Sequence, residues 1–185
     1  MSMIMKSVVV KALESERLIY QPMAMHHATP TYLGWLNDEE VNKYLEVKKE
    51  NTLEELQVYV QDALEKKIFF WAIQLKSDGK HIGNIKIDPI NYKHGTGEYG
   101  IMVGDKTEWG KGYAKEASQA IIDFCFNEMN LRKITLGVVE DNVAAVELYK
   151  KLGFTIEGTY KKHALYNGVY CNIIRMALFN PAYKY

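Results

Sequence analysis

The chain has 185 residues, with 23 Lys or Arg and 23 Asp or Glu, so its formal net charge at pH 7 is zero. Without an excess of positive charge there is no long-range field to attract nucleic acid or an anionic membrane, and we expect neither as a partner. Hydrophobic residues make up 48% of the chain and charged residues 25%, which is typical of a globular enzyme. The length predicts a single domain that is large enough to bury its own hydrophobic core.

Targeting and redox features are few. The first residues lack the apolar core of a signal peptide, and no apolar run approaches the ~20 residues of a membrane helix, which predicts a cytoplasmic protein. Cys125 and Cys171 lie in apolar runs and are expected to be small buried hydrophobes. The five histidines show no ligand spacing, so we expect no metal.

The N-terminal part is predicted to hold one strand, two short helices and a longer third helix. Residues 1–15 carry no clear pattern and are interpreted as an arm or an added edge strand, and residues 17–24 as a strand. Three N-cap residues predict helix starts, namely Thr29, Asp38 and Thr52. The second helix is expected to reach Leu45, and the third has an apolar stripe of Leu53, Leu56, Val60 and Leu64.

The rest of the chain alternates strands with two helices. Strands are predicted at 69–75, 81–90, 99–103, 133–139, 154–159 and 169–178. One helix should follow Gly112, and a second should run from Asn142 to Leu152 and end at Gly153, while Tyr160, His163 and Tyr166 should lie in a loop. The prediction is one mixed α/β (α+β) domain over residues 16–180, with a tail at 181–185. Its sheet should be mainly antiparallel, with six to seven strands flanked by helices.

The most informative segment is Trp109-Gly110-Lys111-Gly112-Tyr113-Ala114, a glycine turn between a strand and a helix. Glycines let backbone N–H groups crowd around an anion, and a helix N-terminus adds positive potential. The pattern therefore predicts a pyrophosphate site, although a glycine turn alone is a weak signal.

A second motif makes the interpretation specific. Asn142 opens a helix that contains Tyr149 and ends in Gly153-Phe154. In this order and spacing, the two motifs resemble the GNAT superfamily of N-acetyltransferases. The resemblance implies a GNAT-like fold, acetyl-CoA as co-substrate and acetyl transfer to an amine. Trp109 departs from the family's commoner Gln or Arg and is similar to the branch of ribosomal-protein alanine acetyltransferases.

The resemblance also implies a set of cofactor contacts. Backbone N–H groups of Met102 and Val103 would stabilise the oxyanion formed at the thioester. The glycine turn, Trp109 to Ala114, would hold the pyrophosphate, and Asn142 would contact the cofactor while capping its helix. Tyr149 would bind beside the thioester and protonate the leaving thiolate, although a Tyr on an apolar helix face is otherwise a core residue.

The general base is less well specified. An alkylammonium must lose a proton before it attacks, and Glu98 before the central strand is the first candidate, with a solvated strand-end Glu as the alternative. Weaker candidates are His81, Asp88, His94 and Glu140. Glu116 is expected to serve the helix N-terminus structurally, and Lys111 either to favour CoA phosphates or to be solvated.

Three aromatic residues are candidates for acceptor binding, namely Trp35, Tyr44 and Trp71, with core packing as the alternative for both Trp residues. We hypothesise a small-molecule amine as acceptor, such as a nucleotide-linked amino sugar, because residues 35–45 resemble enzymes of surface-polysaccharide pathways. The alternatives are a protein N-terminus, suggested by the form of the turn, and a CoA-binding module without catalysis. Family members are often dimers, so a homodimer is a further expectation.

Overall fold

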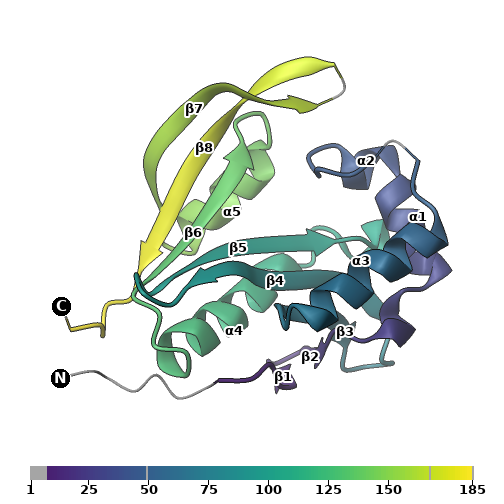
Figure 1. The fold of residues 1–185 in the computed structure, drawn as a ribbon, viewed down its shortest axis with the longest axis horizontal. Coiled ribbons are helices and arrows are strands. Elements are labelled where there is room, and N and C mark those ends of the chain that lie inside the picture. The colour runs from purple at the N-terminus through teal and green to yellow at the C-terminus, as the bar shows by residue number, and fades with distance from the viewer. Residues whose placement is uncertain (1–7, 49, 167, 185) are drawn as a thin grey trace.

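Eight strands form a single sheet in the computed structural model, which describes residues 8–48, 50–166 and 168–184 (Figure 1). The sheet order is β1-β2-β3-β4-β5-β6-β8-β7. The strands are β1 (Leu13–Glu14), β2 (Leu18–Pro22), β3 (Phe69–Leu75), β4 (His81–Asn91), β5 (Thr96–Val103), β6 (Lys133–Val139), β7 (Thr155–Tyr166) and β8 (Val169–Phe179). The predicted mixed, mainly antiparallel domain is confirmed. The sheet exceeds the expected six to seven strands because β1 pairs with β2 as a short edge. Residues 1–7 of the expected arm lie outside the described residues.

Five α-helices cover the two faces of this sheet (Figure 1). They are α1 (Pro30–Asn37), α2 (Glu39–Asn42), α3 (Leu53–Glu65), α4 (Tyr113–Asn127) and α5 (Val143–Lys151). The predicted caps are confirmed: Thr29, Asp38 and Thr52 each accept hydrogen bonds from backbone N–H groups of the first helical turn. The second helix is shorter than expected, since it ends at Asn42.

Two apolar clusters show which helix covers which face. Leu56 and Val60 of α3 pack with Phe70 and Ala72 of β3 on one side. On the other side, residues of α4 and α5 pack against the alternate strand side chains, which include Trp71. Because both faces are covered, β3 is buried along almost its whole length.

One strand pair differs from all the others. β5 and β6 are parallel, because α4 forms the crossover between them. Their pairing covers only Thr96–Glu98 against Lys133–Thr135, and the rest of β6 pairs with β8 alone. The two strands therefore separate after Glu98, which leaves the second half of β5 with a free edge.

Three sequence expectations are wrong in detail. The segment with Tyr160, His163 and Tyr166 is part of β7 and not a loop, because β7 and β8 continue as a long hairpin with irregular register. Leu64 is exposed, and Ala63 takes its place in the buried stripe of α3. Cys125 is buried as expected, whereas Cys171 is only half-buried on the hairpin.

Candidate active site

The free edge of β5 presents alternate backbone amides. The Gly104 N–H donates to the Ile82 carbonyl at 2.9 Å, and the register from Gly83–Val103 to Lys86–Gly100 is unbroken. Hydrogen-bonded pairs alternate along an antiparallel ladder, so the Met102 N–H points to Asn84 of β4. The amides of Ile101 and Val103 point to the free edge. The predicted Val103 amide therefore points to the free edge, together with that of Ile101, whereas the Met102 amide points to β4. The role of these amides toward the acyl oxygen stays a prediction.

The glycine turn has the predicted open backbone. Gly110 and Gly112 adopt positive φ angles of 76° and 83°, in the left-handed region that glycine tolerates without strain. Helix α4 begins directly after Gly112, and no side chain caps this end. The first hydrogen bond of the helix is donated by the Glu116 N–H to the Gly112 carbonyl. The N–H groups of Tyr113, Ala114 and Lys115 therefore lack intrahelical acceptors, which fits a pyrophosphate at this position.

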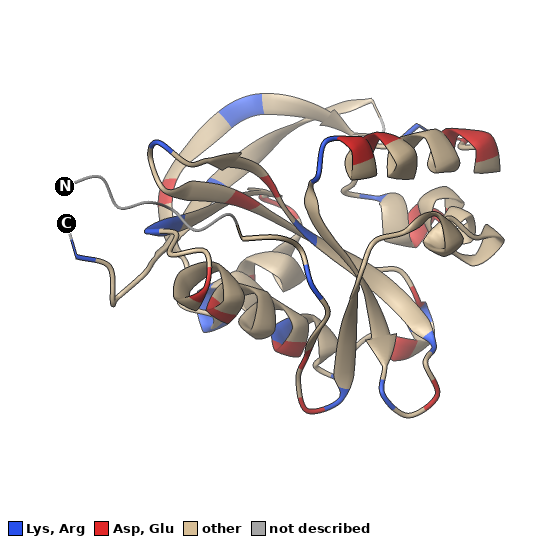
Figure 2. Cartoon of the chain, turned by 60° about the horizontal axis from the view of Figure 1, so that its bottom comes forward, with Lys and Arg blue, Asp and Glu red and all other residues tan. Residues whose placement is uncertain are grey.

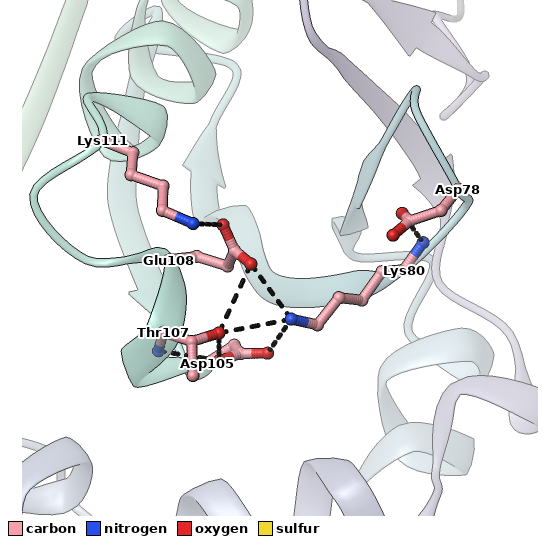
Figure 3. A network of polar contacts seen from close by, with 6 residues as sticks. All are labelled: Asp78, Lys80, Asp105, Thr107, Glu108 and Lys111. Carbon is pink, nitrogen blue, oxygen red and sulfur yellow. Dashed lines mark hydrogen bonds and ion pairs between the residues drawn. The ribbon is translucent and has the colours of Figure 1, made fainter.

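Two side chains of the turn hold its backbone in place. The Trp109 indole N–H donates to the Val103 carbonyl at 2.8 Å and so ties the turn to the end of β5. The Lys111 ammonium lies 2.8 Å from Glu108, a buried carboxylate that also pairs with Lys80 (Figure 3). The pKa of Glu108 is lowered by the hydrogen bonds from Lys111 and Lys80. Lys111 is thus engaged within the protein, and its role toward phosphate stays a prediction.

Arg17 was not singled out in the sequence, yet it lies beside the turn. Its guanidinium donates to Glu116 at 2.7 Å and to the Lys111 carbonyl at 3.0 Å. Its Nη2 lies 3.6 Å from the position that a Cβ on Gly112 would occupy. Burial raises the pKa of Glu116, but hydrogen bonds from Ser15 and Arg17 outweigh it and lower that pKa overall. This agrees with the structural role expected for Glu116, and only the long-range contact reveals Arg17.

Tyr149 lies on α5 and packs against β5. Its ring lies 5.9 Å from Tyr99 of β5, edge-on, and 5.9 Å from Phe154. The residue is 8% exposed, and burial raises its pKa to about 12. No hydrogen-bond partner for its hydroxyl is found within the described part of the chain. A buried, protonated and unpartnered phenol beside the free edge of β5 is suited to donate a proton there.

The start of α5 is tied to the first half of the chain. Asn142 caps α5 by accepting a hydrogen bond from the Ala145 N–H at 3.3 Å, as predicted. Just before it, the carbonyl of Asp141 accepts a hydrogen bond from the hydroxyl of Tyr44 at 3.2 Å. Tyr44 therefore bridges the segment after α2 to the segment before α5. Contacts of Asn142 with cofactor and of Tyr44 with substrate stay predictions.

Glu98 is held in an ion pair. Its two oxygens accept hydrogen bonds from the Arg175 guanidinium, both at 2.7 Å, and one also accepts from the Thr135 hydroxyl at 2.5 Å. Arg175 lies on β8, so the pair joins three neighbouring strands of the sheet. These three hydrogen bonds use most of the acceptor sites of the carboxylate, since its two oxygens together have about four. These contacts give Glu98 a structural role in joining the strands, and its role as general base stays a prediction.

A pocket of about 560 Å³ lies between the helical layer and the sheet, on the α1–α3 side. Its walls are largely apolar and aromatic, with Tyr32, Leu36, Leu45, Val47, Leu56, Tyr59, Phe70, Ile85, Ile101 and Met102. The charged lining residues are Glu46, Lys48, Glu55 and Lys86. The pocket reaches Ile101 and Met102, so it meets the sheet where β5 has its free edge. Sequence patterns did not find it, because its lining comes from five separate elements and loops.

Two of the proposed acceptor-binding residues are core residues instead. Trp71 is fully buried, packs against Phe124 and donates its indole N–H to the Lys11 carbonyl. Trp35 is 7% exposed and lies against His81 and the backbone of Gly104. Neither lines the pocket, because each points into one of the apolar clusters. The core alternative holds for both.

The weaker base candidates also lie outside the pocket lining. His81 hydrogen-bonds through Nε2 to Gly83 and Asn84, and burial lowers its pKa. Glu140 accepts a hydrogen bond from Asn172. Within the pocket, Glu55 accepts from the Thr52 N–H and pairs with Lys48. Glu46 is the lining carboxylate with no ion-pair partner among the described residues.

A sheet that opens beside a parallel strand pair, next to a glycine turn on a helix N-terminus, is the arrangement of an acyltransferase that takes its acyl group from a CoA thioester. The family model of the GNAT acetyltransferase domain matches residues 17–155. The chain therefore belongs to the GNAT acetyltransferase family, whose acyl donor is acetyl-CoA.

Individual relatives agree with this family. Spermidine N(1)-acetyltransferase of Escherichia coli K12 is 35% identical over 109 residues, which span 59% of this chain and 58% of that protein. The match thus covers less than two thirds of that relative's length. Spermidine N-acetyltransferase of Vibrio cholerae, solved with CoA and spermine, superposes with a TM-score of 0.82 at 23% identity, over 90% of this chain and 97% of that one.

A structure of ribosomal-protein-S5-alanine acetyltransferase from Vibrio fischeri gives a TM-score of 0.81 at 22% identity, over 94% of this chain and 99% of that chain. At such identities the structures show the shared fold and do not assign an acceptor.

In the described residues, no helix is long and apolar enough to cross a membrane. Charges of both signs are dispersed over the elements (Figure 2).

Proposed function

We propose that this protein transfers acetyl from acetyl-CoA to the primary amine of a small molecule bound in the pocket on the α1–α3 side. The observation that carries the proposal is the junction at Ile101 and Met102, where this pocket meets the free edge of β5. The glycine turn and Tyr149 lie beside the same strand. The acceptor and the acyl donor can then meet from opposite sides of one strand edge.

Each residue has a defined task in this proposal. The N–H groups of Tyr113 and Ala114 bind the pyrophosphate, and Trp109 fixes their turn against β5. The free amides of Ile101 and Val103 stabilise negative charge on the acyl oxygen. Glu46 is the carboxylate available to take the proton of the amine, directly or through water. Tyr149 donates its proton to the departing thiolate. Acetyl-CoA supplies the activated acyl group.

Three classes of amine are candidates for the acceptor. A nucleotide-linked amino sugar is one small-molecule candidate, in line with the sequence hypothesis. A protein N-terminus is the alternative, supported by the similarity of the fold to the Vibrio fischeri enzyme. A polyamine is a third, supported by similarity to spermidine acetyltransferases. A CoA-binding module without catalysis would not need the free phenol of Tyr149 beside β5. Assembly as a dimer remains a prediction.

The test is release of CoA from acetyl-CoA with a panel of nucleotide-linked amino sugars, amino acids, polyamines and alanine- or serine-starting peptides. Turnover of a small amine supports the proposal. Turnover of peptides alone would favour the N-terminal alternative. Tight binding of acetyl-CoA without turnover of any amine would contradict catalysis and leave a binding module.

A further inference from the structure

The floor of the pocket carries one buried amide with no partner. Asn84 of β4 is 4% exposed, lines the pocket, and its Nδ2 has no hydrogen-bond partner within the described part of the chain. Leaving a buried donor unpaired costs about 1–3 kcal/mol. Such a group persists in a binding site when a ligand completes its hydrogen bonds.

The orientation of this amide is set by its neighbour. The Nε2 atom of His81 lies 3.0 Å from the Gly83 carbonyl and 2.9 Å from Oδ1 of Asn84. A carbonyl can only accept, so Nε2 carries the proton and donates it, and Oδ1 of Asn84 is the acceptor. The NH₂ group of Asn84 then points away from His81. Because Asn84 lines the pocket, its buried NH₂ group is a candidate donor to a ligand that accepts hydrogen bonds.

A positive charge lies on the same strand face. Lys86 follows Asn84 by two residues, so both side chains project from one side of β4, about 7 Å apart at Cα. The Lys86 ammonium contacts the hydroxyl of Tyr59 at 3.4 Å, and no carboxylate lies within ion-pair distance of it in the described residues. Together, Asn84 and Lys86 form a pair of hydrogen-bond donors that suits an anionic group on the substrate.

The position of Asn84 limits where that group can lie on the acceptor. Asn84 is directly opposite Met102 across the β4–β5 ladder, next to Ile101 with its free amide. Side chains in such cross-strand positions lie about 5 Å apart. The anionic group should therefore be close to the reacting amine, as the carboxylate of an α-amino acid is. The apolar and aromatic walls would contact an apolar side chain.

We propose that the acceptor is a zwitterionic α-amino acid with an apolar side chain, whose carboxylate is bound by Asn84 and Lys86. This inference rests on the proposed function, since it names the acceptor of the same site. A polyamine would bring only donors and positive charge to Asn84 and Lys86. The hydroxyls of an amino sugar would find few partners in walls that are mostly apolar.

The test compares three amines that have the same apolar group. Leucine, leucinamide and 3-methylbutylamine share an isobutyl group and a primary amine, but only leucine has a carboxylate and only the first two have a carbonyl. We expect kcat/KM for leucine to exceed that for 3-methylbutylamine by roughly 10- to 100-fold, as for hydrogen bonds to a charged group. Lys86→Met and Asn84→Leu should each reduce this preference, measured as the ratio of kcat/KM for leucine to that for 3-methylbutylamine. Lys93→Met, in the exposed turn after β4, is the matched control.

Several outcomes overturn the inference while the proposed function stands. These are equal kcat/KM for the three amines, a preference for leucinamide or peptides, a preference for spermidine or an amino sugar, and an equal loss for all amines in Asn84→Leu. Titration of the CoA-saturated protein by calorimetry separates the two proposals. Preferential binding of leucine without turnover would support the inference and contradict the proposed function. If leucine were neither bound preferentially nor turned over, both the inference and the proposed function would be overturned.

Discussion

The carboxylate of Glu98 and the guanidinium of Arg175 form a two-point ion pair, with both N–O distances at 2.7 Å. Glu98 lies at the last paired residue of β5 before the strand separates from β6, and Arg175 is on β8. The side chains are only 29% and 27% exposed. The pair therefore joins β5 to β8 at the point where the sheet opens.

Glu98→Gln should affect stability more than catalysis. The substitution removes the charge opposite Arg175, and we expect the free energy of unfolding to fall by about 1–3 kcal/mol. The value of kcat should change less than twofold at a temperature where the variant is folded. Urea unfolding and steady-state kinetics measure the two effects, and a double-mutant cycle with Arg175→Met isolates the pair. A hundredfold loss of kcat with unchanged stability would instead support Glu98 as the base.

Tyr149→Phe should reduce kcat by about 10²-fold or more, because the departing thiolate then lacks its proton donor. Affinity for acetyl-CoA should stay within about threefold, since the ring still packs against Tyr99 and Phe154. Because burial raises the pKa of Tyr149 to about 12, the phenol keeps its proton throughout the neutral range. Tyr170→Phe, on an exposed strand position, is the control. Unchanged turnover would remove Tyr149 from the mechanism.

Gly112→Ala should weaken acetyl-CoA binding by roughly tenfold, because its methyl group would stand among the N–H groups that bind phosphate. It also costs about 1–2 kcal/mol of stability, since φ is 83°. Gly79→Ala is a matched control: its φ is 73°, and a Cβ there meets nothing within 4 Å. Calorimetry should show a loss of affinity only for Gly112→Ala. Equal affinities in the two variants would place the pyrophosphate elsewhere.

Arg17→Met should raise KM for acetyl-CoA several-fold, because the guanidinium no longer holds the Lys111 carbonyl and no longer pairs with Glu116. As a control, Lys76→Met removes a different ion pair, the one with Glu14, and should leave KM unchanged. Initial-rate measurements at varied acetyl-CoA decide the matter. If both variants behaved like the wild type, the turn would be rigid without Arg17.

Stability should decrease as the pH falls from 6.5 to 4. Burial, together with the charges of His26 and His81, lowers the pKa of His27 from 6.5 to about 4. In that window the unfolded chain binds a proton that the folded chain does not, so stability is full above pH 6.5 and is lost below it. The slope from this one group is at most about 1.4 kcal/mol per pH unit.

His27→Asn keeps an acceptor for the Ala24 N–H, which now donates to Nδ1 of His27 at 3.0 Å. Thermal melts at several pH values should show a shallower decline for this variant than for the wild type. His26→Asn, at a more exposed neighbouring position, should retain most of the slope. Parallel curves for wild type and His27→Asn would mean that other groups carry the effect.

The local signals in the sequence were reliable where one segment contains the whole cause. Capping boxes, proline at a helix start and glycine in the left-handed region act within a few residues, so Thr52, Thr29 and Gly153 were correctly placed. The glycine turn and the cap at Asn142 are of the same kind. Predictions were less reliable for residues whose role depends on packing against distant parts of the chain. Trp71 is an example: aromatic residues suit both a core and a binding wall, so the sequence left both open, and the structure shows a fully buried residue.

The sequence by itself determined the family, the class of fold, the glycine turn and the helix of Tyr149, because short-range geometry and residue order encode them. Only the tertiary structure decided which amides of β5 are free, since this depends on the ladder with β4 and the separation from β6. It also paired Glu98 with Arg175, 77 residues apart, and brought Asn84 beside Met102. These contacts join strands that are distant along the chain, and no local pattern records them.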